Sequence, residues 1–240
     1  MKNSVLRTLI LTAVGVSCVF RVSAQETISF GEANLNQVIP DEEFIERFTI
    51  LSGITNNGPY TVEVSFKVVP DDAAGGMWNG DYSAYLIHTA EPLPGTNSLT
   101  AVLINRVGRD TNLLSGYDGN GIDITLRDDG LSNVHTYQFT LGGFVVGTNG
   151  AVSGTGIPDG RLVSPSTVVT SDPVTNLLNA LGERDPNGKW QFKIGDMEAG
   201  FQGKLDSWNV KLTPVIPEPS TWALLVLGAG TLAFALRRKK

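Results

Sequence analysis

The chain has 240 residues, of which 41% are hydrophobic and 18% charged, and its formal net charge at pH 7 is −6. This length is enough for one domain with a sizeable hydrophobic core. The single cysteine, Cys18, excludes a disulfide framework and a thiolate metal site. A negatively charged chain repels a phosphate backbone, so we expect no nucleic acid among its partners.

The N-terminal residues have the pattern of an export signal. Two basic residues, Lys2 and Arg7, precede an apolar run over residues 9–20. After Arg21, Val22-Ser23-Ala24 supplies the small residues that a signal peptidase requires before its cut. We therefore expect residues 1–24 to form a helical signal peptide that is removed on export.

The middle of the chain alternates between apolar and polar residues. Val62, Val64 and Phe66 are separated by polar residues, which is the period of a half-buried strand. Strands are expected at residues 61–68, 82–87, 99–104, 122–126, 137–141, 190–194 and 208–212, with Gly-rich and Asn-rich turns between them. One short helix is expected after Pro173. The sequence thus predicts an all-β, jelly-roll-like antiparallel β-sandwich over residues 25–214.

Acidic residues collect in the expected turns of this domain. Residues 25–216 contain 11 Lys and Arg against 23 Asp and Glu, a net charge of −12. Hard carboxylate oxygens in turns are the ligands that calcium prefers. The candidate calcium ligands are Asp71, Asp72, Asp81, Asp118, Asp123, Asp128 and Asp129. The alternative is that these residues cap turns or are solvated. No other cofactor is expected.

Three tryptophans fall within the domain. Trp190 and Trp208 share the apolar face of their strands, so we expect them in the core. Trp78 lies instead in a Gly-rich acidic loop, where it either packs under the loop or contacts a ligand.

The sequence offers little for catalysis. A catalytic triad needs a histidine between a nucleophile and a carboxylate. His88 and His135 are the only histidines, and no Gly-x-Ser-x-Gly turn occurs. We therefore expect structural histidines and no enzymatic activity.

Two C-terminal motifs resemble a known domain. Gly188–Asp196 is a Gly-x-Trp strand that ends in Asp, and residues 203–212 follow a Gly-x-Leu-x-x-Trp pattern. Together with residues 78–86 and 103–108, they resemble the P domain (P/Homo B domain) of proprotein convertases and related bacterial subtilases. This resemblance implies a jelly-roll sandwich that accompanies serine proteases and has no triad of its own.

The C-terminal residues have three parts in a fixed order. Pro217, Glu218 and Pro219 precede an apolar segment at residues 221–236, and a basic stop follows, formed by Arg237, Arg238, Lys239 and Lys240. Residues 215–240 therefore resemble the PEP-CTERM sorting signal of proteins that an exosortase processes. The apolar segment has 16 residues, about 24 Å as a helix, against a bilayer core of about 30 Å. It predicts transient membrane insertion with the basic tail inside. An ordinary tail anchor is the alternative.

These features predict an exported, non-catalytic β-sandwich with a binding or structural role at the cell surface or in the extracellular matrix. Signal peptidase and an exosortase are the expected processing enzymes. One alternative is a carbohydrate-binding module in exopolysaccharide, which an exposed aromatic platform on one sheet face would distinguish. Another is an accessory P domain that acts with a separate subtilisin-like protease.

Overall fold

The computed structural model describes residues 26–55, 58–91, 97–140, 142–175 and 177–215. The expected signal-peptide helix and the hydrophobic C-terminal helix lie outside these residues, as do Pro217, Glu218, Pro219 and the basic stop. The strands are β1 (Ile28–Glu32), β2 (Gln37–Val38), β3 (Phe44–Leu51), β4 (Tyr60–Pro70), β5 (Tyr82–Ala90), β6 (Ser98–Asn105), β7 (Ile122–Leu126), β8 (Phe144–Val146), β9 (Val152–Gly156), β10 (Gly188–Asp196) and β11 (Gly203–Pro214). The helical turns are η1 (Asp72–Ala74), η2 (Asn79–Asp81), η3 (Val134–Thr136) and α1 (Asn179–Gly182).

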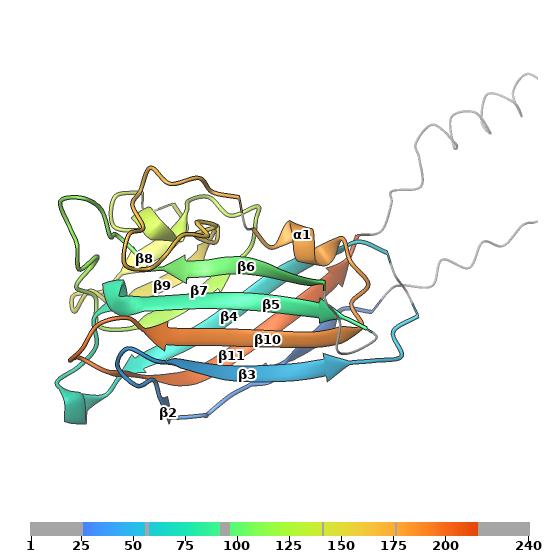
Figure 1. The fold of residues 1–240 in the computed structure, drawn as a ribbon, viewed down its shortest axis with the longest axis horizontal. Helices are drawn as coiled ribbons and strands as arrows, with labels where there is room; N and C mark the ends of the chain where they lie inside the picture. The colour runs from blue at the N-terminus through green and yellow to red at the C-terminus, as the bar shows by residue number, and fades with distance from the viewer. Residues whose placement is uncertain (1–25, 56–57, 92–96, 141, 176, 216–240) are drawn as a thin grey trace, which may run out of the picture.

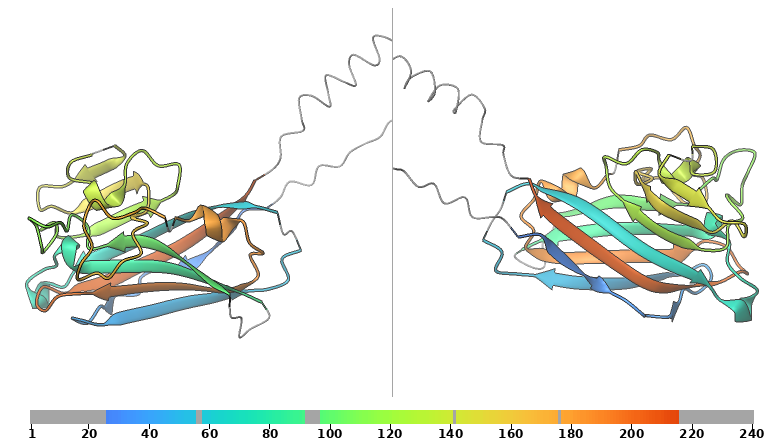
Figure 2. Two further views of the ribbon diagram at one scale, coloured as in Figure 1. Left: turned by 45° about the horizontal axis from the view of Figure 1, so that its top comes forward. Right: turned by 180° about the vertical axis from the view of Figure 1, so that it is seen from behind.

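The strands form two sheets packed face to face, which confirms the expected β-sandwich. The seven-stranded sheet has the order β1-β11-β4-β7-β9-β8, with β2 also paired to β11. The four-stranded sheet has the order β3-β10-β5-β6 and lies in front of β4 and β11 in Figure 1. Figure 2 shows the same two layers from other sides. Most pairs are antiparallel, so each sheet has one face for the core and one for solvent.

The core lies where the alternating faces of β4, β10 and β11 meet. Trp190 and Trp208 are each 1% exposed, which confirms their expected place in the core. The Phe192 ring stacks on Trp208 at 5.7 Å and lies 5.4 Å from Phe66 of the other sheet. Large aromatic rings therefore fill the space between the sheets.

Two expectations about the strands were wrong. Residues 137–140 form a turn, not a strand, because the Asn133 side chain accepts a hydrogen bond from His135 N and starts the helical turn η3. In addition, β7 and β9 pair in parallel. Residues 127–151 lie between them and include η3 and β8, which is the long connection that a parallel pair needs.

The expected short helix is present but brief. It begins at Asn179, six residues after Pro173, and spans four residues. Leu178 and Leu181 are buried there.

The long segment between β9 and α1 is tied to the outer edge of the four-stranded sheet. Asp159 N donates to Leu103 O at 3.0 Å, and Gly160 N donates to Val102 O at 3.0 Å. These bonds satisfy backbone groups at the free edge of β6. They also place residues 162–166 beside the solvent face of that sheet.

Candidate functional site

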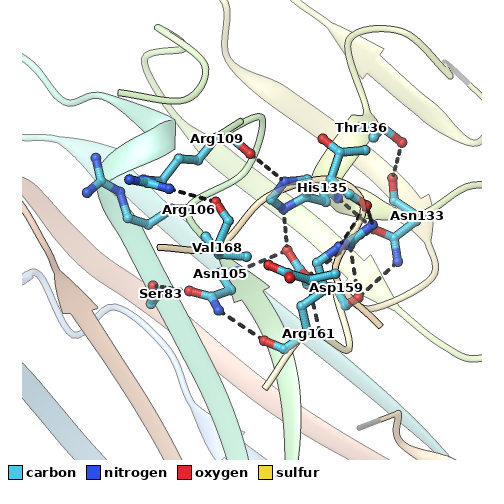
Figure 3. Close-up of polar contacts among 12 residues, drawn as sticks. Ser83, Asn105, Arg106, Arg109, Asn133, His135, Thr136, Asp159, Arg161 and Val168 are labelled. Atoms are coloured by element: carbon cyan, nitrogen blue, oxygen red, sulfur yellow. Dashed lines mark hydrogen bonds and ion pairs between the residues drawn. The ribbon is translucent and has the colours of Figure 1, made fainter. Parts of the chain in front are cut away.

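A buried polar network is centred on Asp159, which has no exposed surface (Figure 3). One carboxylate oxygen accepts from Nδ1 of His135 at 2.7 Å and from Asn105 N at 3.2 Å. The other accepts from Arg161, through the guanidinium at 3.1 Å and the backbone N–H at 3.3 Å. Four donors thus compensate for the burial of this charge.

His135 has a structural place in this network. Its second ring nitrogen, Nε2, lies 3.0 Å from the backbone carbonyl of Arg109. A catalytic triad would have a nucleophile at that position. His135 has no exposed surface, and both of its ring nitrogens face acceptor oxygens. In this arrangement the imidazole connects two segments and has no contact with solvent.

The other histidine is also in the core. His88 is fully buried, and its ring stacks on Trp190 with 4.3 Å between the centroids. Its Nε2 lies 3.3 Å from Asn187 O. Burial lowers the pKa of His88, because the charged form would lose its hydration.

The network fixes the segment that follows Asp159. The Asn105 amide donates to the carbonyls of Arg161 and Val163, each at 3.0 Å. The Arg161 guanidinium donates to Thr170 O at 2.9 Å, and Arg109 donates to Val168 O at 2.7 Å. Residues 161–170 are therefore held by side chains from the sandwich along their length, although they contain no regular structure.

The solvent face of the four-stranded sheet carries exposed aromatic and aliphatic side chains. Along the edge strand β3, Phe44 is 37% exposed, Phe48 58% and Ile50 52%. The next strand, β10, places two lysines over these rings. Lys193 Nζ lies 4.5 Å from the ring centroid of Phe44, and Lys189 Nζ lies 4.8 Å from that of Phe48. Both distances are within the range of cation–π contacts.

A cleft of about 550 Å³ lies on this face. Its lining includes Tyr85 and Ile87 of β5, together with Leu162, Ser164, Pro165 and Ser166. Phe44 of β3 and Lys193 of β10 line it as well. The rings of Phe44 and Tyr85 are 6.0 Å apart and inclined at 48°. The cleft therefore has aromatic walls and a lysine at its rim.

Arg106 also lines the cleft. It is 3% exposed and has a φ of 49°, in the left-handed region that few residues other than glycine adopt. Its Nε donates to Gly80 O at 3.0 Å, and its guanidinium pairs with Glu198 and, at 3.6 Å, with Asp81. These contacts hold the strained backbone in place.

Two buried carboxyls lie behind Arg106. The pKa of Asp81 is raised to about 7, chiefly by burial and next by the negative charge of Asp196, while the positive charge of Arg106 opposes the rise. Burial likewise raises the pKa of Asp196 to about 6. Oδ2 of Asp196 is buried without a hydrogen-bond partner, so this site favours the protonated carboxyl.

The domain should therefore become less stable as the pH rises from about 5.5 to about 8. An aspartate titrates near pH 3.9 in an unfolded chain, but Asp81 and Asp196 have raised pKa values in the folded state. Their contribution to the stability of the folded state is complete below about pH 4 and is lost as the pH rises through about 6 and 7. Because the pKa of His88 is lowered in the folded state, its effect on stability is opposite: below about pH 6.5, stability increases as the pH rises.

Thermal melts across this range measure the effect. We expect the free energy of unfolding to fall by on the order of 2 kcal/mol between the acidic and the alkaline end of this range, at about 1.4 kcal/mol per pKa unit. Asp81→Asn should reduce the pH dependence, because an amide does not titrate. Asp123→Asn removes an exposed carboxylate and should retain the wild-type slope. A wild-type protein that melts at a higher temperature at pH 8 than at pH 5.5 would contradict the raised pKa values.

The residues expected to bind calcium lie in separate turns and loops, except Asp123, which lies in β7. Asp71 caps η1 and pairs with Lys204 at 3.0 Å, while Asp81 pairs with Arg106. Asp128 accepts from Leu178 N at the start of α1, and Asp129 pairs with Arg127. Asp72, Asp118 and Asp123 are exposed. Within the described ranges, no three His, Cys, Asp or Glu side chains are grouped so that they could hold a metal ion. Calcium binding by this chain stays a prediction.

Trp78, the expected ligand residue, packs against a neighbouring loop. Its ring centroid lies 6.0 Å from that of Phe201 at an angle of 39°. The side chain is half-buried. This contact agrees with the alternative in which Trp78 packs under its loop. Ligand binding by Trp78 stays a prediction.

Comparison with known proteins concerns the C-terminal residues. A family model described as the PEP-CTERM protein-sorting motif matches residues 215–239, directly after β11. A search of curated proteins finds no match to the chain. In the part of the chain that the structure describes, no helix is both long enough and apolar enough to span a membrane. The match supports an exported protein that an exosortase sorts.

Proposed function

We propose that this chain is an exported, non-catalytic β-sandwich that an exosortase delivers to the cell surface or extracellular matrix, where it has a binding role. The observation that carries the proposal is the sorting motif at residues 215–239. It begins after Pro214, the last residue of β11. A cut within the motif therefore removes no strand of the sandwich.

The positions of the histidines support a role without catalysis. Both are fully buried, and His135 is held between a carboxylate and a backbone carbonyl. A general base needs access to the proton that it takes from a substrate. Neither histidine has that access in this fold.

We also propose that the domain is related to P domains, as the resemblance of its sequence motifs implies. The two motifs that carry it form β10 and β11, which lie in different sheets and place Trp190 and Trp208 in one core. A jelly-roll P-domain relative that assists a separate subtilisin-like protease is consistent with this arrangement. Co-purification of such a protease with the chain from its native host would favour that role.

Mass spectrometry of the protein from its native host tests the processing. We expect a mature form that begins near Gln25 and lacks residues 221–240, because both ends carry removable signals. A variant with alanine at Pro217, Glu218 and Pro219 should keep its C-terminal residues and remain with the membrane fraction. Recovery of a wild-type surface protein that still ends in Arg237-Arg238-Lys239-Lys240 would favour a simple tail anchor instead.

A further inference from the structure

We infer that the cleft on the solvent face of the four-stranded sheet binds an acidic polysaccharide, a chain of sugar rings that carry carboxylates. The inference rests on the proposed function, because a surface or matrix domain meets such polymers. Four observations lead to it: a preformed cleft, an aromatic lining, a lysine in that lining with a second lysine on the same strand, and the position of the cleft in the domain.

The cleft is built before any ligand arrives. Residues 162–166 form one side, and the side chains of Asn105 and Arg109 hold this segment from within the sandwich. The volume of about 550 Å³ is within the usual range of small-ligand sites. Binding therefore does not have to order a loop, which would weaken affinity.

The walls suit the faces of sugar rings. The ring centroids of Phe44 and Tyr85 lie 6.0 Å apart, and Ile87 also lines the cleft. A pyranose ring presents C–H groups on its faces, which pack on aromatic and aliphatic surfaces. Its hydroxyls point outward, and the hydroxyls of Thr100 and Ser164 line the same cleft. The lining thus combines apolar surface with a few polar groups, as small-ligand sites commonly do.

The charge on this face differs from that of the whole domain. Residues 25–216 have a net charge of −12, yet the central strand β10 presents Lys189 and Lys193 beside the exposed rings. Lys193 has Glu46 as an ion-pair partner at 3.6 Å, a partly exposed contact of small energy. The guanidinium of Arg106, which also lines the cleft, is paired with Asp81 and Glu198. Lys193 is therefore the cation that a carboxylate in the cleft would meet, and Lys189 lies four residues earlier on the same strand.

The position of the cleft suits a tethered domain. In Figure 1 the arrowheads of β10 and β11 point to opposite ends of the sandwich. The sorting motif follows the end of β11, whereas Lys193 and Glu198 lie near the end of β10. The cleft is thus at the far end from the attachment point, where a long polymer has access.

Titration calorimetry on the protein purified from its native host tests the inference. The probes are polygalacturonate and its fully methyl-esterified form, compared in chelator so that no divalent ion links the polymer. We expect binding to the acidic form that weakens with added salt, and at least tenfold weaker binding to the ester. Phe44→Ala and Lys193→Gln should each weaken binding to the acidic form at least tenfold, because they remove an aromatic wall and a rim charge.

Matched substitutions elsewhere control for loss of folding. Val145→Ala removes an exposed apolar side chain of β8, and Lys211→Gln removes an exposed lysine of β11, both on the other sheet. Each should keep wild-type affinity, and all four variants should keep the wild-type melting temperature.

Equal affinity for polygalacturonate and its ester would overturn the acidic specificity. Absence of binding, or binding that Phe44→Ala and Lys193→Gln leave unchanged, would overturn the site. Neither result affects the processing, which mass spectrometry measures separately.

Discussion

Replacing Trp208 with alanine should lower the free energy of unfolding by about 3 to 5 kcal/mol, enough to unfold a domain of ordinary stability. The ring is 1% exposed and stacks on Phe192 at 5.7 Å with an interplanar angle of 14°. Its indole N–H donates to Glu32 at 2.9 Å, so the same side chain ties β11 to the end of β1. The alanine variant loses the ring contacts and leaves a cavity between the sheets.

Urea unfolding of the wild type and variants measures this loss. Trp190→Ala should behave similarly, because that ring is equally buried and stacks on His88. Trp78→Ala is the matched control, since its ring is half-buried and packs on Phe201 at the surface. It should cost less than either core variant. Wild-type stability in Trp208→Ala would contradict the assignment of Trp208 to the core and would indicate that this face of β11 is exposed.

The strands that the sequence predicted share one physical property. Strand β4 buries Val62, Val64, Phe66 and Val68 on one face and leaves polar residues on the other. A half-buried strand shows its burial in the order of its residues, so its period can be read without the structure. The same holds for β7, β10 and β11.

Strand β3 shows why other elements were missed. Its inward face carries Ile45 and Leu51, while its outward face carries Phe44, Phe48 and Ile50. With apolar residues on both faces, the period of two disappears. The signal that remained was the spacing of Phe44, Phe48 and Ile50 on one face, which indicates an exposed apolar surface once a strand is assumed.

The cleft was not predictable because its parts come from distant segments. Phe44, Tyr85 and Lys193 meet through strand pairing, in which Lys193 lies opposite both Glu46 and Tyr85. The wall at residues 162–166 depends on side chains of Asn105 and Arg109, far away in the sequence. Turns, by contrast, are marked by local Asp and Gly residues, so the acidic turns could be recognised in the sequence. An ion-pair partner that comes from a different segment could not.

Replacing Asp159 with asparagine should destabilise the domain by about 3 to 5 kcal/mol, because it leaves the buried Arg161 guanidinium without its counter-charge. The Asp159 carboxylate accepts from His135 and Arg161, and neither it nor His135 has exposed surface. Asparagine keeps the shape of the side chain but removes the charge and one acceptor oxygen. The network of Figure 3 should therefore lose its hold on the segment that follows.

Hydrogen exchange and urea unfolding together test this role. Faster exchange should be concentrated in residues 160–170, since their carbonyls accept from Asn105, Arg109 and Arg161. Asp129→Asn is the control, because its ion pair with Arg127 is exposed at the surface, and such pairs contribute about 1 kcal/mol or less. Adding Arg161→Met to Asp159→Asn should recover part of the lost stability, as the unpaired buried charge is then gone. Equal destabilisation by Asp159→Asn and Asp129→Asn would mean that the network does not support the cleft wall. A large loss that Arg161→Met partly reverses would instead establish that the buried charges of the sandwich keep residues 162–166 in place beside the aromatic face.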